Sequence, residues 1–396
     1  MATTTASPAS EARPVTRAYL DHASSSPLRP AALDAMLPYL RGHPADPGRV
    51  HSEGRVTRVA IEEAREAVAA LVGARPREVV FTATGTESVN TAVWGATTRG
   101  AARLGHPGHL VTTAVEHSSV LEAAQRMGGE VSVVGVDRQA HVAADAVLGA
   151  IRDDTVLVSV QLANHEVGTC QSALDAIVAG ARERGVLVHV DACAAVGHVP
   201  LDFAALGADL CSITAHKLGG PKGAAALLVR RGLRLPPLLL GGAQERARRG
   251  GIEDVPAIVG FGAAAAELVD DDLLAREATT ARAQTAQLLA AARAVDGVEA
   301  LGDPTDRLPH LICVAVAGVE AEPVLLGLDQ RGVAVHSGSS CSSEALEPSP
   351  VLAAMGVDAD RSLRPSVGWS TTDADVAAFA AAFPEVVEKL RALRAG

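Results

Sequence analysis

The sequence predicts an α/β protein with a mainly parallel sheet in a large domain and a smaller α+β domain at the C-terminus. Short apolar runs alternate with helical patterns along the first two thirds of the chain, and many of these runs are apolar at consecutive positions. Such runs are typical of strands that helices cover on both faces. At 396 residues the chain is also too long for one small core, which favours two domains.

Seven apolar runs predict the strands of the large domain. Amphipathic segments lie between them, as at residues 56–72, where Ile61 and Val68 share one stripe and Gly73 is expected to end the helix. This alternation indicates helices packed on a sheet. The runs are VVFTAT (79–84), HLVTTAV (109–115), VSVVGV (131–136), TVLVSVQLA (155–163), VLVHV (186–190), DLCSIT (209–214) and AALLV (225–229).

The domain boundary is expected near residue 268. An Ala-rich helical stretch begins at about Ala263 and ends near Val295, where it could connect the two domains. The remainder, with an apolar run at 311–316 and a helical pattern at 374–393, is typical of a compact α+β domain. The predicted units are a disordered polar leader (1–17), an N-terminal segment that packs with the small domain (18–29), the large domain (30–268) and the small domain (269–396).

Composition excludes several classes of function. The net charge is −11, from 35 basic and 46 acidic residues, and no basic stretch is long enough to follow a phosphate backbone. We therefore expect neither nucleic acid nor an anionic membrane as a partner. The absence of a long apolar run and of a signal pattern predicts a cytoplasmic protein. Five irregularly spaced cysteines predict free thiols rather than a disulfide framework or a zinc site.

Polar residues follow four of the predicted strands. The carboxyl ends of parallel strands meet at one edge of a sheet, so these residues are expected to lie together. Lysine is scarce, so any amine chemistry must come from Lys217, Lys222 or Lys389. The residues at the strand ends are the turn Thr84-Gly85-Thr86, the pair Glu116-His117, Asp191, and the pair His216-Lys217.

Each of these residues allows a chemical and a structural interpretation. Desolvation of Lys217 favours the neutral amine that forms Schiff bases, although a lone lysine is more often structural. Asp191 at a buried strand end needs a cation, such as a protonated ring nitrogen, or serves as a helix cap or ion-pair partner. The turn 84–86, before a helix expected from about Glu87, could bind a phosphate, although such turns are common.

Five motifs in this order resemble those of the cysteine desulfurases, which are class V, fold-type-I pyridoxal-phosphate enzymes. The similarity begins at YLDHASSSP (19–27) and continues to RPSVGWSTTDADV (364–376), so it covers nearly the whole chain. Five ordered motifs are far more specific than any one of them. The motifs are FTATGTES (81–88), VEHSSVLEAA (115–124), HVDA (189–192), TAHKLGGPKG (214–223) and SGSSCSS (337–343).

The resemblance implies pyridoxal 5′-phosphate as the cofactor and a role for each matching residue. Lys217 would form the Schiff base, Asp191 would hold the pyridinium nitrogen, and His117 would stack on the ring and assist proton transfer. Arg364 would bind the substrate carboxylate bidentately, with Asn164 also on the substrate side. The other cofactor contacts implied are Gly85, Thr86, His165, Thr214 and His216.

The resemblance also gives Cys341 a role that its surroundings alone do not. It lies in a Gly/Ser-rich segment, 336–343, with the composition of a mobile turn. The segment resembles the longer, flexible loop of the family, whose thiolate takes sulfur from L-cysteine, releases L-alanine and carries a persulfide to an acceptor protein. A homodimer and an acceptor that is a scaffold or sulfur carrier are implied as partners.

Three positions depart from the family pattern. His165 replaces an Asn and Ala194 replaces a Gln, both of which contact the phenolic oxygen of the ring. Ile252 replaces a Thr that reaches the phosphate from the neighbouring subunit. Each lost hydrogen bond to a charged group is worth roughly 1.5 to 3 kcal/mol. Two alternatives therefore stay open: another class V lyase or aminotransferase with a different amino acid, and a homologue without catalysis.

Overall fold

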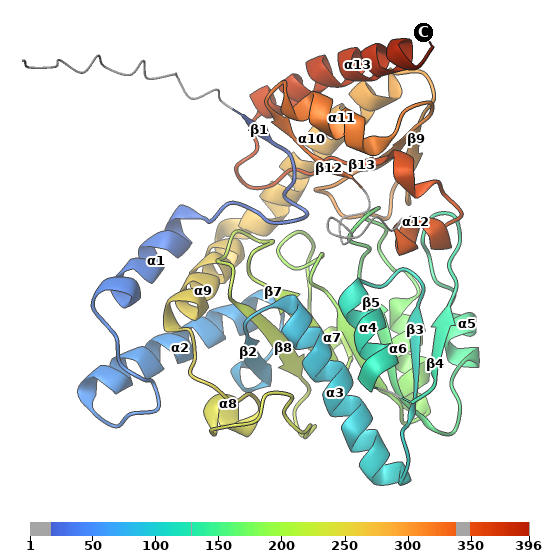
Figure 1. Cartoon of the computed structure of the whole chain (residues 1–396). Coiled ribbons are helices and arrows are strands. Elements are labelled where there is room, and N and C mark those ends of the chain that lie inside the picture. The colour runs from blue at the N-terminus through green and yellow to red at the C-terminus, as the bar shows by residue number, and fades with distance from the viewer. Residues whose placement is uncertain (1–16, 128, 338–348, 396) are drawn as a thin grey trace, which may run out of the picture.

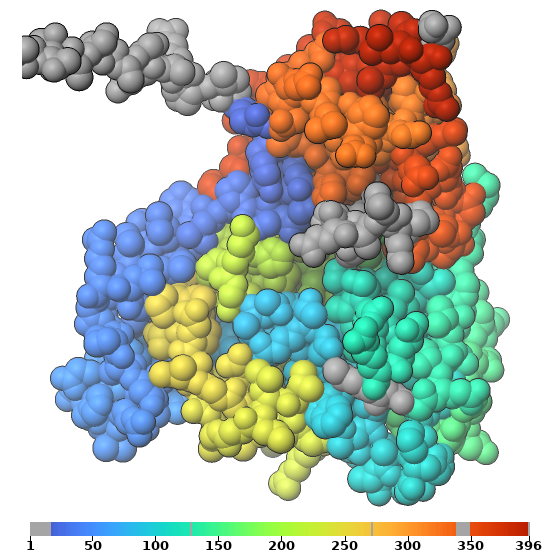
Figure 2. Space-filling model, viewed as in Figure 1, coloured from blue at the N-terminus to red at the C-terminus, as the bar shows by residue number. Residues whose placement is uncertain are grey.

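The structure, a computed structural model, describes residues 17–127, 129–337 and 349–395. A large α/β unit carries a smaller C-terminal unit at one end, where α10, α11 and α13 lie together (Figure 1). In the space-filling view the small unit, orange to red, rests directly on the large one (Figure 2). Among the described helices, none is both long and apolar enough to cross a bilayer.

The large unit contains a seven-stranded sheet with the strand order β2-β8-β7-β6-β5-β3-β4. Strand β8 runs opposite to the other six strands, which share one direction, so the predicted mainly parallel sheet is confirmed. The predicted runs contain six of the strands in full, and β6 is displaced by one residue. The strands are β2 (Val79–Thr82), β3 (His109–Thr113), β4 (Val131–Val134), β5 (Thr155–Gln161), β6 (Leu187–Asp191), β7 (Leu210–Thr214) and β8 (Ala225–Val229).

Helices cover both faces of this sheet. Leu110 and Leu157 pack with α3 and α4 in one apolar cluster, whereas the adjacent Val111 and Val158 belong to the cluster that contains α2, α6 and α9. Neighbouring strand residues point to opposite faces, so consecutive apolar positions bury both faces. The helices are α2 (Ser52–Leu71), α3 (Gly85–Leu104), α4 (Ser118–Met127), α6 (Leu174–Glu183) and α9 (Val255–Val269).

The small unit is an antiparallel sheet of order β12-β13-β10-β9 with its own core. Leu288, Val314, Phe379 and Phe383 are fully buried in that core, and the two phenylalanine rings stack 5.1 Å apart. Its elements are β9 (Val298–Leu301), β10 (Cys313–Val316), β12 (His336–Ser337), β13 (Ser362–Arg364), α10 (Leu273–Arg293), α11 (Ala321–Asp329), α12 (Pro350–Ala354) and α13 (Asp373–Ala395).

The connection between the units differs from the expected continuous helix. Helix α9 ends at Val269, a 3₁₀ turn covers Asp270–Asp272, and α10 begins at Leu273. Three consecutive aspartates repel one another and have low helix propensity, which explains the break. The shorter elements elsewhere are β1 (Ala18–Tyr19), α1 (Pro30–Arg41), η1 (Pro76–Glu78), α5 (Ala144–Gly149), α7 (Phe203–Leu206), α8 (Gln244–Ala247), β11 (Val333–Ala334) and η3 (Ala359–Arg361).

The N-terminal segment runs from the small unit to the large one. Strand β1 pairs in parallel with β11, and Leu20 is buried in the core of the small unit. Further along, the N–H of Ser26 donates to the carbonyl of His216 and that of Arg29 to the carbonyl of Gly219, each over 2.8 Å. The division into residues 18–29, 30–268 and 269–396 stays a prediction.

Candidate active site

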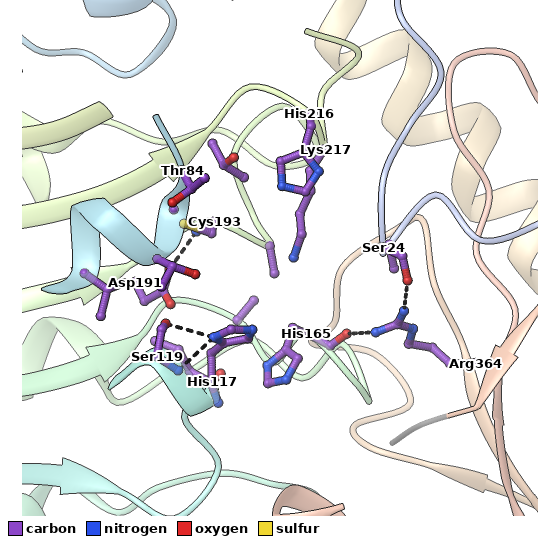
Figure 3. A pocket seen from close by; sticks show the side chains of 18 residues that line it. Ser24, Thr84, His117, Ser119, His165, Asp191, Cys193, His216, Lys217 and Arg364 are labelled. Atoms are coloured by element: carbon purple, nitrogen blue, oxygen red, sulfur yellow. Dashed lines mark hydrogen bonds between the residues drawn. The ribbon is translucent and has the colours of Figure 1, made fainter. Parts of the chain in front are cut away.

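A cavity of about 350 Å³ lies at the carboxyl edge of the large sheet, where residues from both units meet. Strands β2, β5, β6 and β7 all end at this edge because they run in the same direction. Figure 3 shows Lys217, Asp191, His117 and Arg364 around one space. Of the predicted site residues, those on its wall are Gly85, Thr86, His117, His165, Asp191, Thr214, His216, Lys217 and Arg364.

Lys217 is held by a tight turn directly after β7. The N–H groups of Leu218 and Gly220 both donate to the carbonyl of Ala215, over 3.1 and 2.9 Å. Gly219 has a φ of +92°, a conformation that favours glycine. The turn directs the half-buried lysine side chain into the cavity (Figure 3), where its amine can react with a bound carbonyl compound.

Asp191 presents an ionised carboxylate to the same cavity. Its Oδ1 accepts the backbone N–H of Cys193 over 3.0 Å. Burial alone would raise the pKa of Asp191, but His189, the N–H of Cys193 and His117 together hold it below its usual value. His189 itself lies between the hydroxyls of Ser159 and Ser212, each 2.8 Å away. A buried carboxylate beside a cavity is a fitting partner for a protonated ring nitrogen.

The first turn of α3 and the end of β7 form a cradle that fits a phosphate. Thr84 caps α3, since its hydroxyl accepts the N–H of Glu87 over 3.0 Å, so the helix begins at Gly85, two residues before the predicted start. The first N–H groups of a helix are not used within it and bind anions. The hydroxyl of Thr214 is buried without a hydrogen-bond partner among the described residues. An anion with several oxygens would satisfy it.

Two further features of this cradle suit a bound phosphate. Burial, followed by the charges of Lys217 and Lys222, lowers the pKa of His216 to about 4, so its ring is a neutral hydrogen-bond donor. At Gly85 a Cβ would lie only 2.8 Å from the sulfur of Cys193. The close approach of backbone to cavity therefore depends on glycine at this position.

His117 and His165 form the wall opposite Lys217. The ring nitrogen Nδ1 of His117 accepts the N–H of Ser119 over 3.1 Å and lies 2.8 Å from its hydroxyl. The proton of a neutral His117 is therefore on Nε2. The His165 ring stands edge-on to it, with 5.2 Å between centroids. His165 also approaches Glu166, with 3.6 Å from Nε2 to Oε1.

Arg364 enters the cavity from β13 of the small unit. Its Nη1 donates to the carbonyl of His165 over 2.9 Å, and its Nη2 donates to Ser24 over 2.7 Å and to Asp21 over 3.3 Å. The Nε is buried and has no hydrogen-bond partner within the described part of the chain. The guanidinium is thus fixed in place with donor capacity left for a carboxylate.

Two residues singled out from the sequence, Asn164 and Ile252, are not on the cavity wall. Asn164 is not on the cavity wall: its Oδ1 accepts the N–H groups of Glu166 and Val167, and its Nδ2 donates to Val115. This placement gives no support to its predicted contact with a substrate. Cys341 lies outside the described residues. Ile252 is 65% exposed and is not on the wall, whereas Ala194 is.

The cavity also contains residues that the sequence analysis did not select. Ser24 positions Arg364 by accepting a hydrogen bond from it, and Ser119 positions His117 through its contact with the ring nitrogen Nδ1. Cys193 and Gln161 are on the wall as well. Gln161 was missed because the apolar run was extended to residue 163, whereas β5 ends at Gln161. A polar residue within an apolar run was the available signal for a strand end.

Comparisons with known proteins show which family and which solved structures this chain resembles. The family model for class-V aminotransferases matches residues 18–379. The chain is 39% identical to a cysteine desulfurase IscS of Dictyoglomus turgidum over 95% of both chains. A solved NifS-like protein shares the fold with a TM-score of 0.86 and 29% identity, covering 94% of this chain and all of its own. SspA in complex with cysteine matches with a TM-score of 0.77 and 30% identity, over 88% of this chain and 98% of its own.

Proposed function

This chain belongs to the class-V aminotransferase family, and we propose that within it the chain is a pyridoxal-phosphate-dependent cysteine desulfurase. One arrangement carries this proposal: Lys217 and Asp191 face one cavity that also has a phosphate cradle at the start of α3. An amine, a carboxylate and an anion site in one cavity match the aldehyde, ring nitrogen and phosphate of this cofactor.

Pyridoxal phosphate, when bound, withdraws electrons from the Cα of an amino acid. Lys217 would hold it covalently and Asp191 would hold its ring nitrogen. The phosphate would be bound by Gly85 and Thr86 of α3, the hydroxyl of Thr214 and the neutral ring of His216. His165 would contact the phenolic oxygen. Two features support this assignment: the hydroxyl of Thr214 has no hydrogen-bond partner in the described part of the chain, and position 85 is a glycine.

The chain's own groups would position the substrate and move its protons. Arg364 would orient the carboxylate of L-cysteine, because its guanidinium is already fixed by His165, Ser24 and Asp21. Lys217 Nζ would take the proton from Cα. His117 would hold a proton on Nε2, since Ser119 occupies its Nδ1.

Cys341 would receive the sulfur. Its thiolate would attack the sulfur of L-cysteine, so that an S–S bond forms while the Cβ–S bond breaks. The products are then L-alanine and a persulfide on Cys341, and no external oxidant or reductant is needed. The resemblance of segment 336–343 to the family's longer loop supports this step. The persulfide would pass to an acceptor protein, either a scaffold or a sulfur carrier.

A homodimer is a further part of the proposal. Several large apolar side chains are exposed on α1, α2 and segment 239–252, among them Leu240 at 84% and Ile252 at 65%. These regions lie side by side in Figure 2, blue beside yellow, and Arg246 is bonded to Glu62 across them. Burial of this surface by a second copy would be favourable. The free thiols of Cys170, Cys193, Cys211 and Cys313 suit a cytoplasmic location.

The decisive experiment mixes the purified protein with L-cysteine and a reductant and measures alanine and sulfide. We expect equal amounts of both from the wild type, and neither from Lys217→Ala. Cys341→Ser should lose sulfide release, whereas Cys170→Ser, the control at a half-buried free thiol, should keep it. Full activity in Cys341→Ser would contradict the persulfide step. A protein that stays colourless with added cofactor would be a non-catalytic homologue, and turnover of another amino acid alone would identify a different class V enzyme.

A further inference from the structure

We propose that Gln161 donates the hydrogen bond to the phenolic oxygen of the cofactor ring that Ala194 cannot donate. The amide donor would then come from the end of β5 instead of the segment after β6. This inference rests on the proposed cofactor, and it assigns a binding residue that neither the motifs nor the resemblance indicated.

Gln161 occupies the right position in the sheet for this contact. It is the last residue of β5 and the register partner of Asp191 on β6. Paired residues on adjacent strands point to the same face, so both side chains are directed to the cavity, whose wall includes both. The backbone at this strand end is fixed, because the N–H of Gln161 donates to Glu116 over 3.0 Å.

The side chain of Gln161 carries an unused donor. Gln161 is 3% exposed, and its Nε2 is buried without a hydrogen-bond partner among the residues that the structure describes. Buried amide donors are almost always satisfied in native proteins, because an unmade hydrogen bond is costly. A donor that lines a cavity and lacks a protein partner is therefore expected to bind a ligand oxygen.

The chemistry of the ring selects the phenolic oxygen as that acceptor. If Asp191 holds the ring nitrogen, the phenolic oxygen lies on the same edge of the ring, two carbon atoms further on. His165, the other residue implied at this oxygen, follows β5 by four positions and is on the same wall. His165 and Gln161 thus both come from the β5 side of the cavity, and Gln161 is the register partner of Asp191 on the adjacent strand. Ala194 has only a methyl group there.

Three variants test this inference: Gln161→Leu, Ala194→Gln and the double variant. Gln161→Leu should weaken the affinity for pyridoxal phosphate, measured by titration of the apoprotein, by about 10-fold or more, as expected for one hydrogen bond to a charged group. It should also shift the pH midpoint of the bound cofactor's absorbance change. The double variant should recover much of the affinity. Gln284→Leu, a buried glutamine outside this cavity, should change neither quantity.

The outcomes separate this inference from the proposed function. A wild type that binds no cofactor would overturn the proposed function. A wild type that binds it, with Gln161→Leu matching it in affinity and absorbance, would overturn the role of Gln161 alone. If Gln161→Leu does not fold, the Ala194→Gln variant tests the inference instead. Affinity for pyridoxal phosphate that is unchanged or weaker than in the wild type would support the role of Gln161. Affinity about 10-fold higher would contradict it, because the phenolic oxygen would then have lacked this donor in the wild type.

Discussion

Arg65 and Glu245 form a buried bidentate ion pair, although 180 residues separate them in the chain. Both nitrogen-to-oxygen distances are 2.7 Å, and each side chain is 1% exposed. Glu245 also accepts the N–H of Phe81, and Arg65 donates to the carbonyl of Val79. The pair therefore ties α2 and β2 to α8, in which Glu245 and Arg246 have left-handed φ angles of 47° and 59°.

Removal of one member of this pair should destabilise the protein strongly. Arg65→Met leaves the Glu245 carboxylate buried without its cation, and such changes cost about 3 to 5 kcal/mol. Urea denaturation should report this loss in the free energy of unfolding. Glu62→Gln is the control, because Glu62 contacts the same arginine but its own side chain is 36% exposed. This substitution should cost less than about 1 kcal/mol. Equal effects of the two substitutions would contradict the role of the buried pair.

Arg364 should determine the affinity for the substrate carboxylate. Arg364→Lys keeps the positive charge but loses the planar bidentate donor. The loss of one charged hydrogen bond, roughly 1.5 to 3 kcal/mol, corresponds to a rise in KM for L-cysteine of about 10-fold to 100-fold. Steady-state kinetics measures it. Arg361→Lys, at a partly exposed arginine three residues earlier, should leave KM unchanged. A lower kcat with an unchanged KM would speak against carboxylate binding by Arg364.

Two stacked histidines should make the protein sensitive to acid. The rings of His198 and His310 lie 3.5 Å apart and nearly parallel. Burial, followed by the nearby His22, lowers the pKa of His198 to about 3, and burial likewise lowers that of His310. Both rings are thus neutral when folded but gain protons below pH 6.5 when unfolded. Stability should fall as the pH drops from 6.5 toward 4, by up to about 1.4 kcal/mol per pH unit for each ring.

The test of this acid sensitivity compares slopes rather than absolute stabilities. His198→Gln should reduce the dependence of the free energy of unfolding on pH between 6.5 and 4, whatever its effect at neutral pH. His106→Gln, at an exposed histidine, removes no buried ring and is the control. An unchanged slope in His198→Gln would show that this ring is not the source of the sensitivity.

The sheet could be predicted from the sequence, because strands buried on both faces leave uninterrupted apolar runs. Polar residues at strand ends likewise indicated Lys217 and Asp191, since parallel strands bring their carboxyl ends to one edge. Ser24 could not be found in this way, and Gln161 was missed. Ser24 reaches the cavity through a segment that pairs with residues more than 300 positions away. The selection of Gln161 required knowledge of where β5 ends, and strand ends are set by tertiary packing.

The protonation states of two buried carboxyl groups, Asp191 and Glu116, could not be predicted from the sequence. Nothing in the order of residues distinguishes Asp191, which is ionised, from Glu116, which is fully buried after β3, with β5 between their two strands. Burial raises the pKa of both groups, but for Asp191 it is outweighed by His189, the N–H of Cys193 and His117, whereas for Glu116 it outweighs the hydrogen bonds from Thr113 and Gln161. Their opposite protonation states therefore follow from the fold alone.

Glu116 should make the protein less stable in mildly alkaline solution. Burial, the largest cause, raises its pKa to about 8, against a hydrogen bond from Thr113 and the N–H of Gln161. The folded protein therefore holds a proton that the unfolded chain releases above pH 4.5. The contribution of Glu116 to stability should fall as the pH rises from about 4.5 to 8, by up to about 1.4 kcal/mol per pH unit.

Glu116→Gln removes this proton without changing the size of the side chain. Between pH 6.5 and 8, the free energy of unfolding of the variant should therefore decline less than that of the wild type. This interval is chosen because it lies above the titration of the unfolded histidines. Urea denaturation at several pH values measures it. Glu122→Gln, at an exposed glutamate on α4, keeps the buried carboxyl and should behave as the wild type. If Glu116→Gln and the wild type decline in parallel, the carboxyl of Glu116 is already ionised in the folded protein at neutral pH.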